Sequence, residues 1–333
     1  MKIFLIACIF FLFPAILFAQ EDVGKLHETA KAFMMQRDYA NASLILVRAL
    51  QQEPDNIAIA KDLAFDYYLQ KENDKGIKVI LPFLDKSSVD DQAYQIAGMI
   101  YKATRNTKEA ENVYKKALKK FPQSGPIYND YGALLYSAND KNAIKIWEKG
   151  IEQDPSYANN YYSATKYYYI EKDKIWPLIY GEIFLNMESF TARTAEIKDL
   201  VLDGYKRLFA ETDLLKNLKD KNLFEVAFLT VMNKQNSVVF GGINAESLTM
   251  IRTRFILDWA QDYKEKFPFY LFDFQEQMLK QGLFVAYNQW IFGSAQNLAA
   301  YETWTQTNNK DNADFIKFQK ERIFKMPEGQ YYH

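Results

Sequence analysis

The sequence predicts an all-α protein, in which an α-α superhelix of repeated helix pairs is followed by a helical C-terminal region. Three observations lead to this prediction. Glycine and proline are scarce, at 13 and 9 of 333 residues, whereas a β-sandwich or barrel needs a turn about every 8–12 positions. Small and large apolar residues recur with a period of 34 from about residue 23 to 155, and more weakly to 190. Beyond that point the period is lost, but apolar residues keep helical spacing.

The composition is that of a folded protein with few of the usual catalytic and metal-binding side chains. Hydrophobic residues make up 49% of the chain, and the formal net charge is −1, without the basic footprint of a nucleic-acid binder. Cys8 is the single cysteine, and His27 and His333 are the two histidines. These counts exclude a disulfide framework and a zinc site made of Cys and His. We therefore expect no catalytic residue, no metal and no cofactor.

Residues 1–19 are expected to be a secretory signal peptide. Lys2 provides a basic start, an uncharged apolar run extends from Ile3 to Phe18, and Ala19 is a small residue where cleavage is expected. An uncleaved membrane anchor is a weaker alternative. The apolar run would span only about 24 Å as a helix, against a hydrocarbon core of about 30 Å.

Acylation of Cys8 is a further alternative, because Leu5, Ile6 and Ala7 precede it in a sequence that looks like a bacterial lipobox. However, fewer residues precede this cysteine than a normal apolar region needs. We therefore expect an exported protein located in the periplasm, with release to the outside as the alternative. A contact with a membrane is expected only if the signal stays uncleaved.

The 34-residue period consists of two columns of small residues, each followed by a column of larger ones. An aromatic or aliphatic residue stands three places after the first small residue, and a large apolar residue stands four places after the second. Prolines close three of the units, at Pro54, Pro122 and Pro155. The small residues are Ala30, Ala64, Gly98 and Gly132 in the first column and Ala42, Gly76, Ala110 and Ala143 in the second.

Each unit is interpreted as two short antiparallel helices. The small residues lie where helices approach most closely, and the large residues fill the space between them. Proline ends the second helix because it cannot continue the hydrogen-bond ladder. One such unit cannot bury its apolar face alone, so several units must stack.

This pattern resembles the tetratricopeptide repeat (TPR) family over about residues 23–190. The second unit departs from the pattern, because Phe83 replaces a small residue. A fifth unit begins near Ala158 and departs at Pro177, which fits only if its helix starts near Asp173 and holds the proline in its first turn. The third unit matches best, with Tyr94, Ala97, Gly98, Tyr101, Ala110, Tyr114, Ala117 and Pro122 in the signature places. The resemblance implies a TPR solenoid of four to five repeats.

The resemblance also implies that the first helix of each unit lines a concave groove, which binds a protein or peptide partner. The groove candidates are aromatic and apolar residues with scattered lysines, which suits a peptide with apolar anchors and some acidic character. These candidates are Lys61, Phe65, Tyr68, Met99, Lys102, Tyr136, Tyr162, Lys166 and Tyr169. In the alternative, several of the tyrosines pack against the C-terminal half instead.

The C-terminal region, residues 191–333, is expected to be helical and resembles no family that we recognise. Asn244 is the expected N-cap of a helix that runs through Asp262. Pro268 separates that helix from the next, and Gly293 is expected to end an aromatic element that begins at Phe284. The other expected helices cover Ala195–Phe209, Leu223–Val231, a segment starting near Tyr270, Asn297–Thr305 and Asn312–Phe324, with a loose tail after Pro327.

Aromatic residues are concentrated between Phe267 and Phe292. The simpler interpretation is a helical core. The alternative is an exposed pocket, through which this half would bind a non-protein ligand such as a glycan or lipid. The sequence therefore favours an exported scaffold that binds another protein or peptide without catalysis, and the module for a non-protein ligand is the alternative.

Overall fold

A computed structural model describes residues 22–216 and 218–333, and these residues form helices without a single strand. The all-α prediction is therefore confirmed. The expected signal peptide, residues 1–19, lies outside the described residues. Among the helices that the structure describes, none is both long and apolar enough to cross a membrane.

The chain divides into two compact units after Val89. The first unit contains two helix pairs, and side chains of Asp22, Asp38 and Asn56 accept hydrogen bonds from backbone amides at the starts of three of its helices. Such caps satisfy amides that the helix itself leaves unpaired. The elements are α1 (Val23–Met35), α2 (Tyr39–Gln52), α3 (Ile57–Leu69), α4 (Asn73–Ile80) and the short 3₁₀ helix η1 (Leu81–Phe83).

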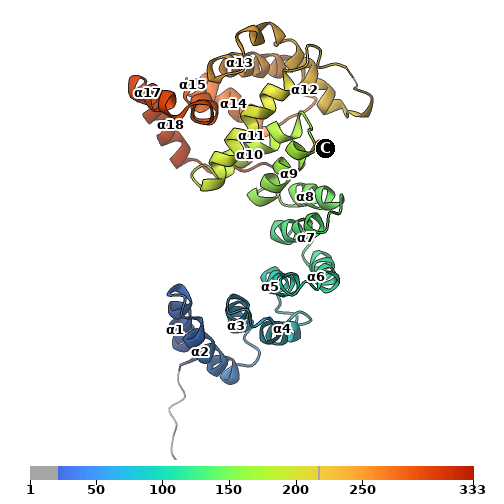
Figure 1. Cartoon of the computed structure of the whole chain (residues 1–333), viewed down its shortest axis with the longest axis vertical. Helices are drawn as coiled ribbons and strands as arrows, with labels where there is room; N and C mark the ends of the chain where they lie inside the picture. Colours follow the sequence, from blue (N-terminus) through green and yellow to red (C-terminus); the bar gives the residue numbers. More distant parts are fainter. Residues whose placement is uncertain (1–21, 217) are drawn as a thin grey trace, which may run out of the picture. The chain divides into compact units, whose positions relative to one another are not determined.

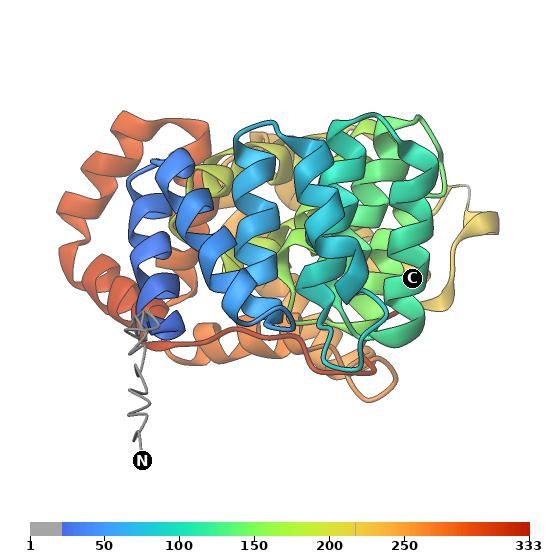
Figure 2. The ribbon, with the colours of Figure 1, turned by 90° about the horizontal axis from the view of Figure 1, so that it is seen from below.

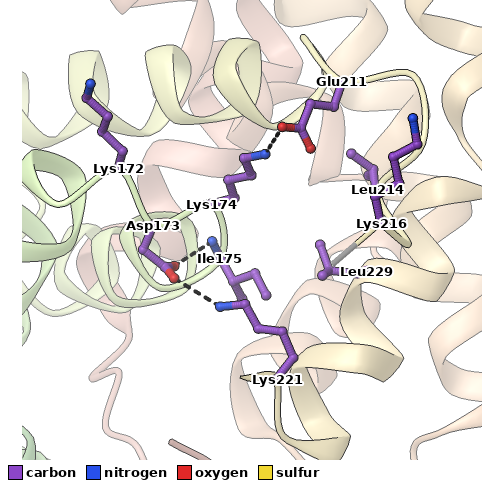
Figure 3. A pocket seen from close by; sticks show the side chains of 9 residues that line it. All are labelled: Lys172, Asp173, Lys174, Ile175, Glu211, Leu214, Lys216, Lys221 and Leu229. Atoms are coloured by element: carbon purple, nitrogen blue, oxygen red, sulfur yellow. Dashed lines mark hydrogen bonds and ion pairs between the residues drawn. The ribbon is translucent and has the colours of Figure 1, made fainter. Parts of the chain in front are cut away.

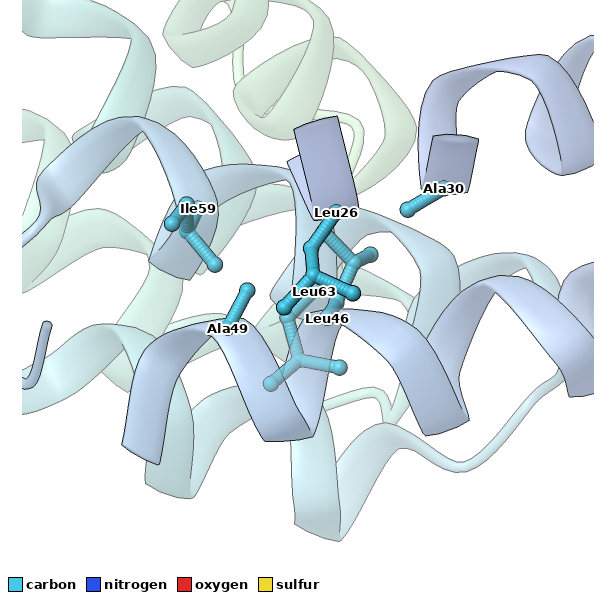
Figure 4. Close-up of a cluster of buried hydrophobic side chains, with 6 residues drawn as sticks. All are labelled: Leu26, Ala30, Leu46, Ala49, Ile59 and Leu63. Carbon is cyan, nitrogen blue, oxygen red and sulfur yellow. The ribbon is translucent and has the colours of Figure 1, made fainter. Parts of the chain in front are cut away.

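The core of the first unit forms where α1, α2 and α3 meet (Figure 4). Its side chains are small on one helix where they are large on the facing one. The Ala30 side chain is fully buried, and so is that of Leu46 on α2. The buried members are Leu26, Ala30, Leu46, Ala49, Ile59 and Leu63.

The second unit begins with three helix pairs that follow one another in a stack (Figure 1). They are α5 (Asp91–Ala103) with α6 (Thr107–Lys120), α7 (Gly125–Ser137) with α8 (Ala143–Gln153), and α9 (Ala158–Ile170) with α10 (Trp176–Met187). The rest consists of α11 (Ala192–Leu208), η2 (Leu218–Asp220), α12 (Leu223–Asn233), η3 (Asn236–Gly241), α13 (Ala245–Asp262), α14 (Tyr270–Lys280), α15 (Phe284–Asn288), the π-helix η4 (Gln289–Gly293), α16 (Ser294–Gln296), α17 (Leu298–Thr307) and α18 (Asn309–Glu321).

All five helix pairs turn in the same way. One residue in each turn takes a left-handed backbone conformation, with φ between 57° and 63°, and the amide after it bonds back to a carbonyl of the first helix. This pairing closes the helix end as in a Schellman motif. The residues are Arg37, Lys71, Arg105, Asn139 and Lys172. Their spacings follow the sequence period, so the fifth unit has the same turn as the others.

The helices of each pair cross so closely that a large side chain on one requires a small residue on the other. A Cβ atom on Gly98 would lie 2.6 Å from the Tyr114 hydroxyl, and one on Gly132 would lie 2.8 Å from Cε2 of Trp147. In the fifth pair the order is reversed. There the glycine is Gly181 on α10, facing Thr165 on α9.

The fifth pair also accommodates its proline as the sequence suggested. Pro177 lies in the first turn of α10, where the missing amide costs nothing. Asp173 precedes that turn, and its Oδ1 accepts hydrogen bonds from the amides of Ile175 and Trp176, both at 2.8 Å.

A buried polar network connects α10 to the C-terminal helices. Glu182 on α10 pairs with Arg252 on α13, and both side chains are almost fully buried. Glu182 Oε1 also accepts hydrogen bonds from Gln275 Nε2 and from the Tyr287 hydroxyl, each at 2.7 Å. Since removing one partner of a buried pair typically costs about 3–5 kcal/mol, this network holds four elements together.

Most of the C-terminal helix expectations are confirmed. Asn244 caps α13 by accepting a hydrogen bond from the Ser247 amide at 2.8 Å, and α13 ends at Asp262. The expectation for Gly293 is wrong, because the helix continues through the π-helix η4 into α16 and ends at Gln296. The extra residue in a π turn lets the chain continue past a glycine.

The expectation of a loose tail is also wrong. Residues 322–333 run as an extended segment (Figure 2) and make specific contacts. The Tyr332 ring stacks on Phe224 with centroids 4.7 Å apart, and its hydroxyl donates to the Pro268 carbonyl at 2.7 Å. His333 Nε2 lies 2.7 Å from the Tyr168 hydroxyl. These aromatic contacts attach the segment to the second unit.

We predict that Gly98→Ala lowers the free energy of unfolding by about 1 kcal/mol or more, because the added methyl overpacks the Tyr114 ring. Adding Tyr114→Leu to Gly98→Ala should recover part of the loss, since a smaller partner leaves room for the methyl. Urea unfolding measures both. Gly241→Ala is the control, because a Cβ there meets nothing within 4 Å. Equal stability of Gly98→Ala and wild type would refute the close crossing.

A second prediction concerns Asp66, whose side chain is fully buried in α3. Burial raises the pKa of its carboxyl to about 6, although a hydrogen bond from Gln70 opposes this. Because the folded pKa lies above the unfolded one, stability is greatest below about pH 4 and decreases as pH rises towards 6. Asp66→Asn should therefore raise the melting temperature at pH 8 more than at pH 4. Exposed Asp74→Asn is the control, and an equal effect at both pH values would contradict the assignment.

Candidate functional site

The first helices of successive pairs form one face of the second unit, which we call the first-helix face and define as α5, α7, α9 and α11. Side chains about 34 residues apart bond across neighbouring helices of this face. Gln95 Nε2 donates to Asp130 Oδ2 at 2.8 Å, and Asn129 Nδ2 donates to Ser163 Oγ at 3.0 Å. The repeat in the sequence thus becomes a ladder of contacts in space.

The ladder continues into α11, beyond the expected end of the repeats at residue 190. Tyr162 donates to Glu196 Oε2 at 2.5 Å, and Tyr169 donates to Asp203 Oδ2 at 2.8 Å. Both pairs are 34 residues apart. α11 therefore takes the place of the first helix of a further unit, although the signature residues of the repeat are absent from it.

In the first unit, the candidates Lys61, Phe65 and Tyr68 lie together on α3, and all three are half-buried. The rings of Phe65 and Tyr68 stack with centroids 6.0 Å apart. Nearby, His27 on α1 bonds to Asp62 on α3 at 2.7 Å between Nε2 and Oδ2. The structure therefore brings these candidates to one side of α3.

In the second unit, Met99 and Lys102 lie on α5 and Tyr136 lies on α7. Lys102 is exposed, and Tyr136 is 45% exposed although its ring packs at 5.7 Å from Trp147 and 6.2 Å from Tyr167. A large aromatic side chain held by its neighbours but open to solvent has the properties of an interaction anchor.

The other three candidates, Tyr162, Lys166 and Tyr169, are engaged by α11. Lys166 Nζ forms an ion pair with Glu196 Oε1 at 2.7 Å. The hydrogen bond from Lys166 is the largest cause of the lowered pKa of the Glu196 carboxyl. These side chains contact a helix of residues 191–333, as the alternative interpretation expected for several tyrosines. They form the end of the first-helix face rather than its open part.

Two arginines on α11 were missed by the sequence reasoning. Arg207 lies over the Tyr169 ring, 3.9 Å from its centroid, and Arg193 lies over the Tyr162 ring at 4.8 Å. Arg193 NH1 also donates to Asn159 Oδ1 at 2.9 Å. A signal for these residues was present, because Arg193 follows Asn159 by 34 positions.

A pocket of about 220 Å³ lies where the turn before α10 faces the segment after α11 (Figure 3). Its carboxylates already have partners, since Asp173 Oδ2 accepts from Lys221 Nζ at 3.2 Å and Glu211 pairs with Lys174. Lys172 and Lys216 are exposed at its rim. Paired charges and mobile surface lysines do not define a ligand.

The aromatic side chains of the C-terminal half form a core. Of the aromatic residues between Phe267 and Phe292, only Tyr270 is not buried. A cavity of about 10 Å³ is the space left beside Tyr205, Phe228, Phe255 and Phe272, which is about the minimum for one water. The exposed aromatic pocket of the alternative hypothesis is therefore not formed by these residues. In the part of the chain that the structure describes, acidic, His and Cys side chains do not gather into a group able to hold a metal ion.

Comparison with known proteins gives one curated relative and several solved structures. No family model matches the chain. A TPR-containing protein of Dictyostelium discoideum is 25% identical over 154 residues, which cover 45% of this chain and 11% of that protein. The chain therefore spans only a small part of that relative's length.

The solved structures that resemble the chain are helical repeat proteins. PilF of Pseudomonas aeruginosa is 15% identical and aligns with a TM-score of 0.46 over 60% of this chain and 93% of its own. A tetratricopeptide repeat protein of Parabacteroides merdae is 15% identical, with a TM-score of 0.43 over 72% of this chain and 91% of its own. YrrB, described as a TPR protein with an unusual peptide-binding site, is 14% identical, with a TM-score of 0.38 over 54% of this chain and 93% of its own.

The five equivalent turns, the 34-residue ladder and the curated relative identify the class of the repeats. The chain belongs to the tetratricopeptide repeat family.

Proposed function

We propose that this protein is an exported scaffold that binds another protein or a peptide on its first-helix face, without catalysis. The observation that carries the proposal is Tyr136, a large aromatic side chain that is 45% exposed near the centre of that face. Its ring is held by Trp147 and Tyr167, so a partner would not have to immobilise it on binding. Such preorganised aromatic anchors dominate many protein interfaces.

The open part of the face favours a peptide with an apolar anchor and an acidic group. Met99 and Tyr136 supply apolar contact area, and the half-buried Ala133 leaves space between them. Lys102 is exposed at the end of α5 and can pair with a carboxylate of the partner. The ladder towards α11 supplies a rigid wall, because its polar side chains already bond to each other.

A non-protein ligand such as a glycan or lipid is the weaker candidate in the aromatic C-terminal half. The aromatic residues that suggested it are buried among themselves. Stacking against a sugar ring or an acyl chain would require exposed rings.

We predict that Tyr136→Ala with Lys102→Glu weakens partner binding about tenfold or more. A photo-crosslinking amino acid at position 136 of the full chain, followed by mass spectrometry of adducts from envelope extract, identifies the partner. Binding of that partner to the double variant is then measured by titration. Leu257→Ala is the control, because Leu257 is exposed on α13, away from this face. Unchanged affinity in the double variant would exclude this face.

Export is the other part of the proposal, and it depends on the sequence of residues 1–19. We predict that protein recovered from a Gram-negative host lacks residues 1–19 and is found in the periplasmic fraction. Intact mass measures the cleavage. Ala19→Asp should block it, because the processing site needs a small neutral residue. Recovery of full-length wild type from the cytoplasmic fraction would contradict export.

A further inference from the structure

Lys198 on α11 is a buried cation without a carboxylate partner. Its side chain is 9% exposed. The hydroxyl of Ser294 is its hydrogen-bond acceptor at 3.2 Å from Nζ, and Nζ lies 4.1 Å from the centre of the Trp290 ring. Among the described residues, no carboxylate lies within ion-pair distance of this Nζ. An ammonium has three donors, so these two contacts leave it incompletely satisfied.

Other buried cations of the second unit are paired differently. Arg252 is bonded to Glu182, and Lys221 lies 2.8 Å from Glu225 and 3.2 Å from Asp173. Because a buried charge without a counter-charge is costly, the fold supplies carboxylates in those places. At Lys198 it supplies a hydroxyl and an open space instead.

That space is a pocket of about 380 Å³ between the start of α11 and the chain from Ser294 to Leu298. We call it the Lys198 pocket. Its volume is in the range of small-molecule sites. Its lining is mainly hydroxyls and small side chains, namely Ser189, Thr191, Thr194, Ala195, Lys198, Asp199, Ser294, Ala295 and Leu298.

Two features of the backbone add to the case for a bound anion. Thr191, Thr194 and Ala195 belong to the N-terminal end of α11, a helix of 17 residues, where the helix dipole favours negative charge. The π-helix Gln289–Gly293 leads directly to Ser294, and it contributes both Trp290 and the turn that presents the Ser294 hydroxyl. Single π turns inside helices are frequent at functional sites.

We propose that the Lys198 pocket binds a small oxyanion, either a carboxylate or a sulfate- or phosphate-like group, which pairs with the Lys198 ammonium. The Ser294 hydroxyl donates to the Trp290 carbonyl at 2.8 Å and so presents a lone pair to Lys198. This arrangement orients the ammonium, and the ligand supplies the missing negative charge. The inference is independent of the first-helix face.

The electrostatics of the pocket give the binding a definite pH dependence. Burial lowers the pKa of Lys198 to about 7, and the nearby Asp199 opposes this weakly. The facing segment, residues 289–298, has no titratable side chain, and Glu188 next to the pocket is paired with Arg193. An oxyanion stabilises the ammonium and raises its pKa, so affinity should be greatest below about pH 7 and decrease at higher pH.

The test is a titration of the full chain with sodium acetate and with sodium sulfate, since neither anion changes its charge between pH 6 and 9. The NMR signals of ¹³C-labelled lysine side chains are followed at constant ionic strength. We expect the Lys198 signal to shift saturably with at least one of the two anions, and its pKa to rise at saturation. The anion that saturates distinguishes a carboxylate ligand from a sulfate- or phosphate-like one.

Lys198→Met should weaken that binding about tenfold or more, because it removes the charge but keeps an apolar stem of similar length. Lys206→Met is the matched control, since Lys206 is exposed on the same helix. If Lys198→Met does not fold, the saturable shift and the rise in pKa in the wild type still decide the question. Shifts that stay linear with both salts, or equal affinity in folded Lys198→Met, would overturn the proposal.

Discussion

The two helices of each repeat cross so closely that only one of them can place a large side chain at the crossing. Glycine on α5 and α7 makes room for Tyr114 and Trp147, whereas Gly181 on α10 makes room for Thr165 on α9. The constraint is therefore on the sum of the two side chains and not on either position alone. Because every pair satisfies it, all pairs take the same crossing and the same left-handed turn, and this regularity lets them stack.

The ladder on the first-helix face is a consequence of that regular stacking. When successive pairs repeat the same geometry, side chains one period apart come into contact, as Gln95 and Asp130 or Tyr169 and Asp203 do. α11 joins the ladder without the signature of the repeat, because contact with α9 and α10 requires only a helix of suitable face and length. Gly204 on α11 meets Leu178 of α10 in the same way that glycines meet large side chains inside the pairs.

The C-terminal helices cover the end of the stack through interactions of another kind. Aromatic rings supply most of the apolar core, and the pair of Glu182 and Arg252 adds directional bonds that only one packing of α10, α13, α14 and α15 can satisfy. Exposed positions such as Tyr136 and incompletely satisfied ones such as Lys198 stand apart from these two patterns. For that reason they carry the functional proposals.

The sequence by itself determined the helical class, the five repeated pairs and individual caps such as Asn244, because periodicity and capping are local properties of the chain. It also indicated candidates on the first-helix face, since a column of a repeat occupies one face. Only the tertiary structure decided that Tyr162, Lys166 and Tyr169 are engaged by α11, that residues 322–333 are attached through Tyr332 and His333, and that Lys198 is buried without a carboxylate. Those outcomes depend on contacts between residues far apart in the chain, and the spacing of residue types does not specify such contacts where the period has ended.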